Sequence, residues 1–338
     1  MDDLSEKQVR IGALMTQIYG TFGPACKEQH ILKEMFRAGM TGMRLNLSHV
    51  DLSDSAKQIG AFHAAAEGIC EPQLVIDTQG PELRIGDLST PLMLENNSTV
   101  DLGATGIPVP QVVLSALDDG CEVLLDDGRI ALHVTDAKRG RAEVIRGGLL
   151  SSRKSVKLPG KTIRLPVLTE RDLRNIRQAA EYGVTGLLQP FVRNGEDLKE
   201  LRQLLEENGA GFLQIFAKIE SMEGVEQLEE ILPYADVIVI ARGDLGNDMP
   251  LWRLPAVQKQ ISTACRAAGK PFIVVTQMLA SMENAPIPTR AEVNDIFNAV
   301  IDGAWGVMLT GETAVGKYPV EAIRYLTKTA ESAQDWSQ

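Results

Sequence analysis

The chain has 338 residues, of which 44% are hydrophobic and 23% are charged, and its formal net charge at pH 7 is -11. This length and composition suit a soluble globular protein with a full core, and no window approaches the roughly 18 consecutive apolar residues of a membrane helix. The acidic charge argues against a nucleic-acid surface, because phosphate backbones are bound by concentrated basic faces.

The amino terminus and the cysteines predict a cytoplasmic protein. Residues 1–10 read MDDLSEKQVR, a polar stretch without the apolar core of a signal peptide. The cysteines stand too far apart for a CxxC or zinc pattern, and scattered thiols are typical of a reducing compartment. They are Cys26, Cys70, Cys121 and Cys265. We therefore expect neither a nucleic-acid nor a membrane partner.

Eight short apolar runs alternate with amphipathic stretches, which is typical of parallel βα units. In chain order, the predicted strands are residues 11–18, 42–47, 73–78, 184–189, 212–219, 236–242, 271–276 and 305–310. The carboxyl ends of the third and fourth runs are 111 residues apart, and the other intervals are 23 to 34 residues, near the roughly 30 residues of one βα unit. The count favours a closed (β/α)₈ TIM barrel, with an open doubly wound sheet as the alternative.

The long third interval predicts an inserted domain. Residues 87–165 contain short strand-like runs, frequent Gly and Pro, and the Asp-Gly turn of LLDDGRIALHV. We predict a small β-barrel domain there, following the third strand, and a catalytic barrel formed by residues 1–86 and 166–338. A helix is expected from Pro319, and we expect no further domain after it.

Charged residues end the fifth and sixth predicted strands. Lys218 and Glu220 alternate along the chain, as do Arg242 and Asp244, so each pair is expected on one side of its strand. The carboxyl ends of barrel strands form the active-site face, and neighbouring strands lie about 4.8 Å apart. Glu220 and Asp244 should bind Mg²⁺ or Mn²⁺, because carboxylates without nearby His or Cys suit hard cations. Lys218 beside them would stabilise charge on an anionic substrate.

Two other interpretations of these charges are open. A ring of structural salt bridges also places charged residues at strand ends, and the tripeptide Arg-Gly-Asp at 242–244 also occurs as an adhesion motif. An adhesion motif needs a mobile exposed loop, whereas this one follows an apolar run. Four charged residues at two neighbouring strand ends favour a site.

Polar residues end the second and third strands as well. Asn46 and Ser48 share one face of RLNLSH with Arg44, and Asp77 and Thr78 end the third strand. Oxygen atoms of Asn46, Ser48, Asp77 and Thr78 could form a small cage for a monovalent cation. The alternative is that they cap the following helices.

Three further positions have a less specific pattern. His49 is a site candidate beside Ser48, with an ordinary surface histidine as the alternative. Thr276 ends the seventh strand. Thr289 and Glu292 have the spacing of a capping box, which predicts a helix start there.

The strand-end motifs resemble those of the pyruvate kinases over nearly the whole chain. In order they are TFGPAC, GMRLNLSH, IDTQGPELRIG, LLDDGRI, KLPG, AKIESMEG, IARGDLG, TQMLASM, PTRAE and VIDGAWGVMLTGETAVGKYP. The resemblance implies transfer of the phosphoryl group of phosphoenolpyruvate to ADP, which gives ATP and, after protonation of the enolate, pyruvate. The inserted domain would be a lid over the barrel face.

The resemblance also implies roles for individual residues. Lys218 is similar to the lysine that stabilises the transferring phosphoryl group and the enolate, and Arg44 to the arginine on the substrate phosphate. The backbone of Gly243 and Asp244, with the side chain of Thr276, would hold the substrate carboxylate. Thr276 also lies near the point where the family protonates the enolate.

Two cations and a nucleotide site are implied in the same way. Glu220 and Asp244 match the ligands of the divalent metal, and Glu82 is the form similar to potassium-requiring members. The residues that match the potassium site are Asn46, Ser48, Asp77 and Thr78. The residues that match the nucleotide site are His49, Arg84 and Lys154.

The sequence departs from the family pattern at five positions near the expected nucleotide and substrate edges. This sequence has Gln79 where the family usually has lysine, Pro190 where it has serine, and Ser221 where it has asparagine. It has Ser155 and Lys157 where the family usually has glycine and asparagine. These departures bear on the preferred phosphoryl acceptor more than on the chemistry.

Typical members also carry a carboxyl-terminal effector domain, and we expect this protein to lack it. We therefore expect no activation by sugar phosphates, and any homodimer to form through the barrel helices. Two rival functions are a metal-dependent aldolase or decarboxylase that acts through pyruvate enolate, and a non-catalytic phosphoenolpyruvate-binding protein. Lys154 and Lys218 argue against the lyase, and the retained metal positions argue against the binding protein.

Overall fold

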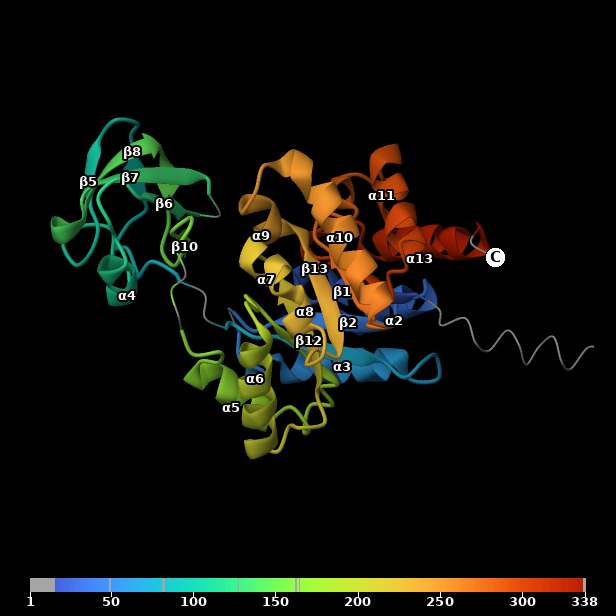
Figure 1. Ribbon diagram of the computed structural model, residues 1–338. Coiled ribbons are helices and arrows are strands. Elements are labelled where there is room, and N and C mark those ends of the chain that lie inside the picture. The colour runs from blue at the N-terminus through green and yellow to red at the C-terminus, as the bar shows by residue number, and fades with distance from the viewer. Residues whose placement is uncertain are drawn as a thin grey trace, which may run out of the picture. The chain divides into compact units, whose positions relative to one another are not determined.

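The computed structural model describes residues 16–48, 50–80, 83–126, 128–161, 163 and 165–336. The chain divides into two compact units (Figure 1). We call Met1–Gly80 together with Leu168–Gln338 the barrel unit, and Pro81–Val167 the small unit. The sequence pattern had suggested residues 87 and 165 as the limits of the inserted segment.

Eight parallel strands of the barrel unit close on themselves in the order β1-β15-β14-β13-β12-β11-β3-β2. The strands are β1 (Gln17–Thr21), β2 (Gly42–Asn46), β3 (Gln73–Asp77), β11 (Gly186–Gln189), β12 (Gln214–Ile219), β13 (Val237–Ala241), β14 (Phe272–Val275) and β15 (Gly306–Met308). Pairing of β1 with β15 completes the closure. The predicted TIM barrel is therefore confirmed, and the open doubly wound alternative is wrong.

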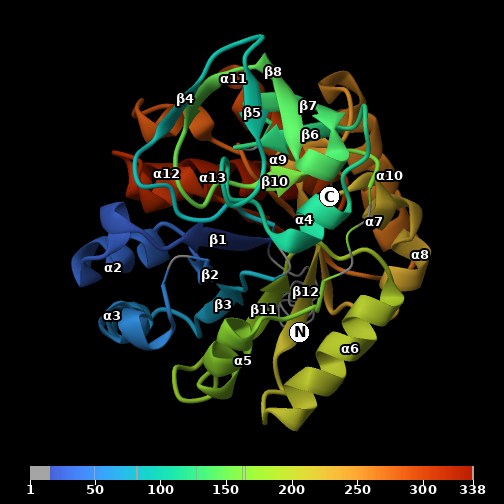
Figure 2. The same cartoon turned by 90° about the vertical axis from the view of Figure 1, so that its left-hand side faces the viewer.

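Helices surround the strands, as Figure 2 shows for α3, α5 and α6 outside β3, β11 and β12. The helices of the barrel unit are α2 (Gln29–Arg37), α3 (Ala56–Ala66), α5 (Glu170–Arg177), α6 (Gly195–Glu207), α7 (Met222–Glu226), α8 (Leu228–Ile231), α9 (Arg242–Asn247), α10 (Leu254–Ala267), α11 (Arg290–Ile301), α12 (Gly311–Ala314) and α13 (Pro319–Trp336). The predicted capping box of Thr289 and Glu292 begins α11, and Pro319 begins α13. Among the described residues, we find no helix with the length and apolar character needed to cross a bilayer.

Aromatic rings fill the barrel interior near the starts of the strands. Tyr19 is fully buried and meets Phe216 edge-on, with ring centroids 6.3 Å apart. Glycines make room for both rings: a Cβ on Gly42 would lie 2.7 Å from the ring of Tyr19, and one on Gly186 would lie 2.7 Å from that of Phe216. The apolar packing therefore occupies the amino-terminal part of the barrel.

The strand registers bring the carboxyl ends of the strands to one edge, where polar residues follow. The pairs nearest this edge are Asn46 with Asp77, Leu188 with Asp77, Gln189 with Ala217, Ile219 with Ile240, and Ala241 with Val275. Residues that follow these pairs in the chain are thereby gathered around the same end of the barrel.

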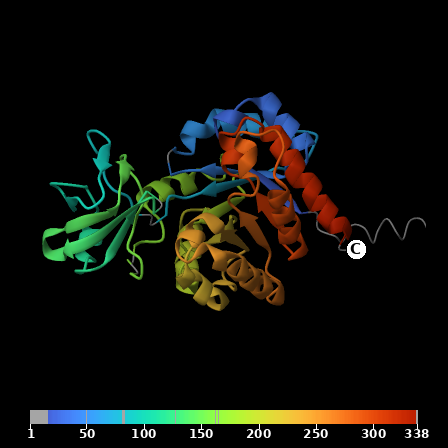
Figure 3. The ribbon, with the colours of Figure 1, turned by 90° about the horizontal axis from the view of Figure 1, so that it is seen from above.

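The small unit, predicted as a β-barrel, has two antiparallel sheets among its described residues. Figure 3 draws this unit in teal and green. Its elements are β4 (Leu92–Leu94), β5 (Thr99–Asp101), α4 (Gln111–Ser115), β6 (Glu122–Leu125), β7 (Ile130–Asp136), β8 (Arg141–Arg146), β9 (Gly148–Leu150) and β10 (Val156–Lys157). The larger sheet has the order β10-β6-β7-β8-β5, and β4 pairs with β9. The unit has an apolar core of its own, which includes Val123, Leu132 and Val144.

One local prediction is wrong. The strand expected at 236–242 ends at Ala241, and α9 begins at Arg242. Residues 242 to 244 therefore follow helical geometry, in which positions two apart do not share a face. Arg242 and Asp244 do not alternate along an extended chain as the pattern suggested. The strand expected at 11–18 is β1, Gln17–Thr21, and residues 11–15 lie outside the described part of the chain.

Candidate active site

A chain of alternating charges crosses the carboxyl end of the barrel. Arg44 of β2 donates to Asp77 of β3, with Nε and Nη2 2.8 and 2.7 Å from Oδ2. Lys218 of β12 lies between two carboxylates, with Nζ 3.4 Å from Asp77 Oδ2 and 2.8 Å from Glu220 Oε1. The side chains of Asp77 and Glu220 are only 3% and 2% exposed. Sequence reasoning predicted all four as site residues, and the structure brings them together.

The ion pairs decide the protonation of these groups. Burial alone would lower the pKa of Lys218, but the carboxylates of Asp77 and Glu220 outweigh it and hold that pKa above its usual range. Burial would raise the pKa of Asp77, yet Lys218 and Arg44 together hold it below its ordinary value. Lys218 is therefore a fixed ammonium group at neutral pH, and Asp77 a fixed carboxylate.

Glu220 has the opposite shift. Burial raises its pKa, and the charges of Asp244 and Asp77 raise it further, although Lys218 opposes them. Its oxygens contact two donors: Oε1 is paired with Lys218, and Oε2 accepts the N–H of Phe191 at 2.8 Å. A bound cation would relieve the repulsion between these carboxylates.

The donor set of this pair fits a hard divalent cation. Glu220 and Asp244 offer carboxylate oxygens, which suit Mg²⁺ or Mn²⁺. No group of three His, Cys, Asp or Glu side chains is placed to hold a metal ion within the part of the chain that the structure describes. A cation held by these two carboxylates would have further coordination positions for oxygens of water or substrate.

Thr276 lies just beyond β14 in a strained backbone. Its φ is 76° and that of Gln277 is 56°, left-handed values that cost non-glycine residues energy and that persist where neighbouring groups impose them. Arg242 supplies that support: its guanidinium reaches the carbonyl oxygens of Val275 at 3.3 Å and Thr276 at 2.7 Å, and it pairs with Asp295 at 2.6 Å. The arginine that follows β13 therefore holds the end of β14.

Gly243 lies against Thr276 because α9 begins immediately after β13. A Cβ at Gly243 would be 3.2 Å from Thr276 Cγ2, which is tighter than ordinary contact. The backbone of the first turn of α9 and the Thr276 side chain thus lie side by side. Two of the predicted substrate-carboxylate positions are brought together in this way.

The residues predicted for potassium already have local partners. Asn46 Oδ1 accepts the N–H of Ser48 at 3.1 Å, and Thr78 Oγ1 donates to the carbonyl oxygen of Leu188 at 3.3 Å. Asn46 pairs with Asp77 across β2 and β3, and β2 ends at Asn46, so Ser48 lies in the following turn. The structure gathers these oxygen-bearing residues, and their potassium binding stays a prediction.

Two of the residues predicted for the nucleotide, Arg84 and Lys154, lie in the small unit. The third, His49, is outside the described residues, as is Glu82. Lys154 Nζ is 2.7 Å from Asp126 Oδ1. Arg84 forms an antiparallel bridge with Ser155, and its Nη1 donates to the carbonyl oxygen of Arg153 at 2.7 Å. Arg84 and Lys154 are therefore neighbours within one unit.

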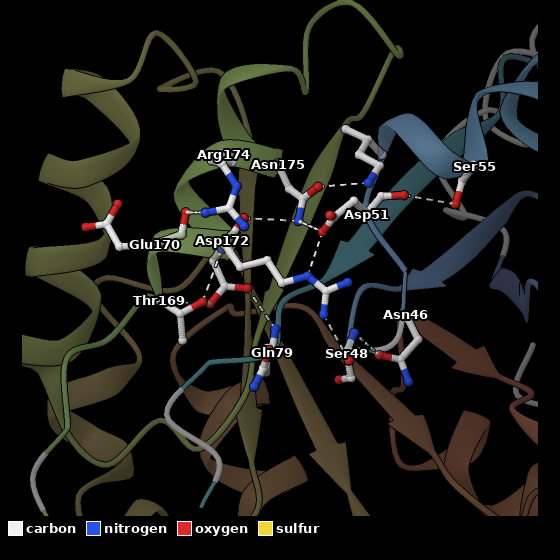
Figure 4. Close-up of polar contacts among 12 residues, drawn as sticks. Asn46, Ser48, Asp51, Ser55, Gln79, Thr169, Glu170, Asp172, Arg174 and Asn175 are labelled. Carbon is white, nitrogen blue, oxygen red and sulfur yellow. Dashed lines mark hydrogen bonds and ion pairs between the residues drawn. The ribbon is translucent and has the colours of Figure 1, made fainter. Parts of the chain in front are cut away.

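A polar network around α5 escaped sequence analysis (Figure 4). Arg171 reaches Asp51 Oδ1 at 2.6 Å and the carbonyl oxygen of Ser48 at 3.2 Å, and Asn175 Oδ1 accepts the N–H of Leu52 at 2.8 Å. These bonds tie α5 to the segment after β2. The local signal was the capping-box spacing of Thr169-Glu-Arg-Asp172.

The fold and these side chains define a class: a (β/α)₈ barrel protein with a buried lysine and acidic groups at the carboxyl ends of its strands. The family model described as "Pyruvate kinase, barrel domain" matches residues 13–323. The chain belongs to the pyruvate kinase family.

Curated relatives show the same likeness. The chain is 37% identical to a pyruvate kinase of Bacillus licheniformis, over 95% of this chain and 57% of that protein. It is 39% identical to one from Sporosarcina psychrophila, over 95% and 58%. For a pyruvate kinase of Clostridium acetobutylicum the identity is 37%, over 95% and 70%. The chain thus spans a little over half the length of the first two relatives.

Proposed function

We propose that the protein transfers the phosphoryl group of phosphoenolpyruvate to ADP. The arrangement of Arg44, Asp77, Lys218 and Glu220 supports this most directly, because phosphoryl transfer depends on positioned charges rather than on covalent chemistry by the protein. The cationic side chains of Arg44 and Lys218 lie at this site. The carboxylates of Glu220 and Asp244 fit a divalent metal. Membership of the family agrees with this assignment.

In the proposed reaction, the bond between phosphorus and the enol oxygen breaks while a terminal oxygen of ADP bonds to phosphorus. Lys218, held as an ammonium group by two carboxylates, stabilises negative charge on the moving phosphoryl group and on the enolate oxygen left behind. Arg44 binds the phosphate oxygens. Each group is in place before substrate arrives, so little reorganisation is needed at the moment of transfer.

The enolate then takes a proton at its methylene carbon. We assign the hydroxyl of Thr276 to the delivery of this proton, with water restoring the hydroxyl proton. The backbone N–H groups of Gly243 and Asp244 would bind the substrate carboxylate beside Thr276. The strained backbone at Thr276 and Gln277 supports a functional position, since strain of this kind clusters at active sites.

Glu220 and Asp244 would hold Mg²⁺ or Mn²⁺, which when bound supplies Lewis-acid stabilisation of phosphoryl oxygens. Asn46, Ser48, Asp77 and Thr78 would hold K⁺. Arg84 and Lys154, together with His49, would contact the nucleotide phosphates. A cytoplasmic location and a homodimer through the barrel helices stay predictions.

The direct test is an assay of the purified chain for pyruvate formed from phosphoenolpyruvate and ADP. We expect turnover that requires Mg²⁺ or Mn²⁺ and rises when K⁺ replaces a bulky organic cation. Absence of ADP-dependent turnover, together with cleavage of a 2-keto acid, would instead favour the lyase. Binding of phosphoenolpyruvate without either reaction would favour the non-catalytic binding protein.

A further inference from the structure

At both points where the chain passes between the two units, backbone N–H groups donate to one buried carboxylate, that of Asp172. The chain leaves the barrel unit at Gly80 and re-enters it at Leu168. Asp172 Oδ1 accepts the N–H of Gln79 at 2.9 Å, and Oδ2 accepts that of Gly80 at 3.2 Å. Oδ2 also accepts the N–H and the hydroxyl of Thr169 at 2.9 and 2.7 Å. Figure 4 shows Asp172 between Gln79 and Thr169.

Because Asp172 is buried, loss of these hydrogen bonds would destabilise the fold at this point. The residue is 1% exposed, and a carboxylate has room for about four accepted hydrogen bonds, so the two connections and the helix start fill its capacity. Bonds to an ionised acceptor are stronger than neutral ones, and a buried N–H that loses its acceptor is destabilising. Asp172 therefore holds the backbone of both connections at a defined place on α5.

The outgoing connection is also held from its other side. The N–H and the hydroxyl of Thr78 both lie 3.3 Å from the carbonyl oxygen of Leu188 at the end of β11. Gly80 has φ +56°, and a Cβ there would lie 2.5 Å from Pro190 Cγ. The segment from Asp77 to Gly80 thus runs between β11 and α5 with little room to shift, and Asp77 is the carboxylate that fixes Lys218.

We propose that Asp172 is a positioning residue that holds, within the barrel unit, the two points at which the chain leaves for the small unit and returns from it. The part of this inference that concerns turnover rests on the proposed function. Asp172 touches none of the groups proposed for phosphoryl transfer. It acts through Gln79 and Gly80, which follow the site residues Asp77 and Thr78, and through the return segment at Thr169.

Helix capping is the competing explanation. Thr169 and Asp172 form a reciprocal capping box at the start of α5, and a carboxylate at this position is common for that reason alone. The capping box accounts for the bonds between Thr169 and Asp172, which also hold the return segment, but not for the N–H groups of Gln79 and Gly80 that donate to Asp172. Thr169→Val removes the hydroxyl from the capping box and leaves the bonds that Gln79 and Gly80 donate, whereas Asp172→Asn weakens both sets.

The test measures amide hydrogen exchange at Gln79 and Gly80 in the full chain, for wild type, Asp172→Asn and Thr169→Val. We expect exchange at both amides to be at least about tenfold faster in Asp172→Asn and unchanged within about twofold in Thr169→Val. Asp236→Asn is the control for a carboxylate that accepts a backbone N–H elsewhere: Asp236 accepts that of Ile215 at 2.7 Å at the opposite end of the barrel, and it is more exposed than Asp172. It should leave both amides unchanged.

Turnover provides the second measurement. Because the small unit carries Arg84 and Lys154, Asp172→Asn should raise the KM for ADP about fivefold or more, whereas Thr169→Val and Asp236→Asn should leave it within about twofold. If Asp172→Asn does not fold, Asp172→Glu replaces it, since the longer side chain keeps the charge but displaces the oxygens. The same results are expected.

Unchanged exchange at Gln79 and Gly80 in the Asp172 variant would overturn the inference. Equal acceleration of exchange in Thr169→Val would also overturn it, because the effect would then belong to the helix cap. Accelerated exchange with an unchanged KM for ADP would also reject the positioning role in turnover. If the wild-type protein has no activity but exchange in Asp172→Asn is still faster, the proposed function is refuted. The structural role of Asp172 at Gln79 and Gly80 then still holds.

Discussion

Lys218 in the barrel unit and Lys154 in the small unit are both assigned to phosphate groups, but their surroundings differ. The side chain of Lys218 is 15% exposed and contacts two carboxylates, whereas that of Lys154 is 36% exposed and pairs with Asp126. Moving Lys218 would leave two buried carboxylates short of a partner, which is costly. Releasing Lys154 would leave Asp126, whose side chain is 10% exposed, with Arg129 at 3.7 Å. The two lysines therefore differ in their own exposure and in the number of carboxylates that hold them: two for Lys218 and one for Lys154.

The largest expected effect comes from Lys218→Met. Loss of a fixed charge at the reacting group should lower kcat about a thousandfold. Methionine fills similar space, but Asp77 and Glu220 lose a buried partner, so the free energy of unfolding should fall as well. Steady-state rates of pyruvate formation, with circular dichroism as the check on folding, provide the measurement. A variant that keeps more than about a tenth of the wild-type kcat would remove Lys218 from the mechanism.

The next effect concerns stability at the same cluster. Asp77→Asn should lower the free energy of unfolding at neutral pH by about 3 kcal/mol, because Arg44 and Lys218 lose a buried partner. The pKa of Asp77 is held below its ordinary value, so in acid the unfolded chain binds more protons at this position than the folded one. The contribution of Asp77 is therefore present above an ordinary Asp pKa of about 3.9 and is lost as the pH falls below that value.

Urea titrations from pH 7 to pH 3 test this expectation, and Asp87→Asn is the control. The pKa of Asp87 is also lowered, by Arg153, but this pair is fully exposed in the small unit. The stability of wild type should fall more steeply with acid than that of Asp77→Asn, and Asp87→Asn should follow wild type. Parallel curves for wild type and Asp77→Asn would show that burial of the ion pair does not stabilise the fold.

Lys154→Met should have a smaller effect, confined to the nucleotide. Because Lys154 is partly exposed and is assigned to the nucleotide phosphates rather than to the reacting groups, we expect the KM for ADP to rise about tenfold and kcat to change less than about threefold. Lys138→Met, at an exposed turn of the same unit between Ala137 and Arg139, is the control. A fall in kcat as large as that of Lys218→Met would contradict the contrast between the two lysines.

The smallest expected effect is that of Gly243→Ala. Its new Cβ would press on Thr276 Cγ2 at 3.2 Å, so the KM for phosphoenolpyruvate should rise about threefold. Gly246→Ala in the same helix is the control, since its Cβ would meet only Leu254 and Leu251 at ordinary contact distances of 3.5 and 3.6 Å. Equal kinetics for the two variants would show that Thr276 tolerates the displacement.

The barrel was predictable because its evidence is local and repeated. Each βα unit has an apolar run and an amphipathic stretch at a regular spacing, and the strand ends then place Arg44, Lys218 and Glu220 at one edge without further information. The error at residue 242 has a physical reason. An apolar run does not show whether the next residue continues the strand or begins a helix. Here Arg242 begins α9, and its guanidinium donates to the carbonyl oxygen of Thr276.

The role of Asp172 could not be predicted in the same way. Its partner Gln79 is 93 residues away in the chain, and no periodic pattern links a helix start to a backbone N–H at that distance. The spacing from Thr169 to Asp172 indicates a capping box and nothing more. Likewise, the support that Arg242 gives to the strained end of β14 depends on strand neighbours whose contact appears only in three dimensions.

The aromatic packing of Tyr19 and Phe216 has a consequence for substitutions away from the charged groups. A Cβ added at Gly42 would lie 2.7 Å from the ring of Tyr19, and one at Gly186 would lie 2.7 Å from that of Phe216. A larger side chain at either position must displace a ring or the backbone, so we expect low tolerance to substitution at two glycines that lie outside the proposed site.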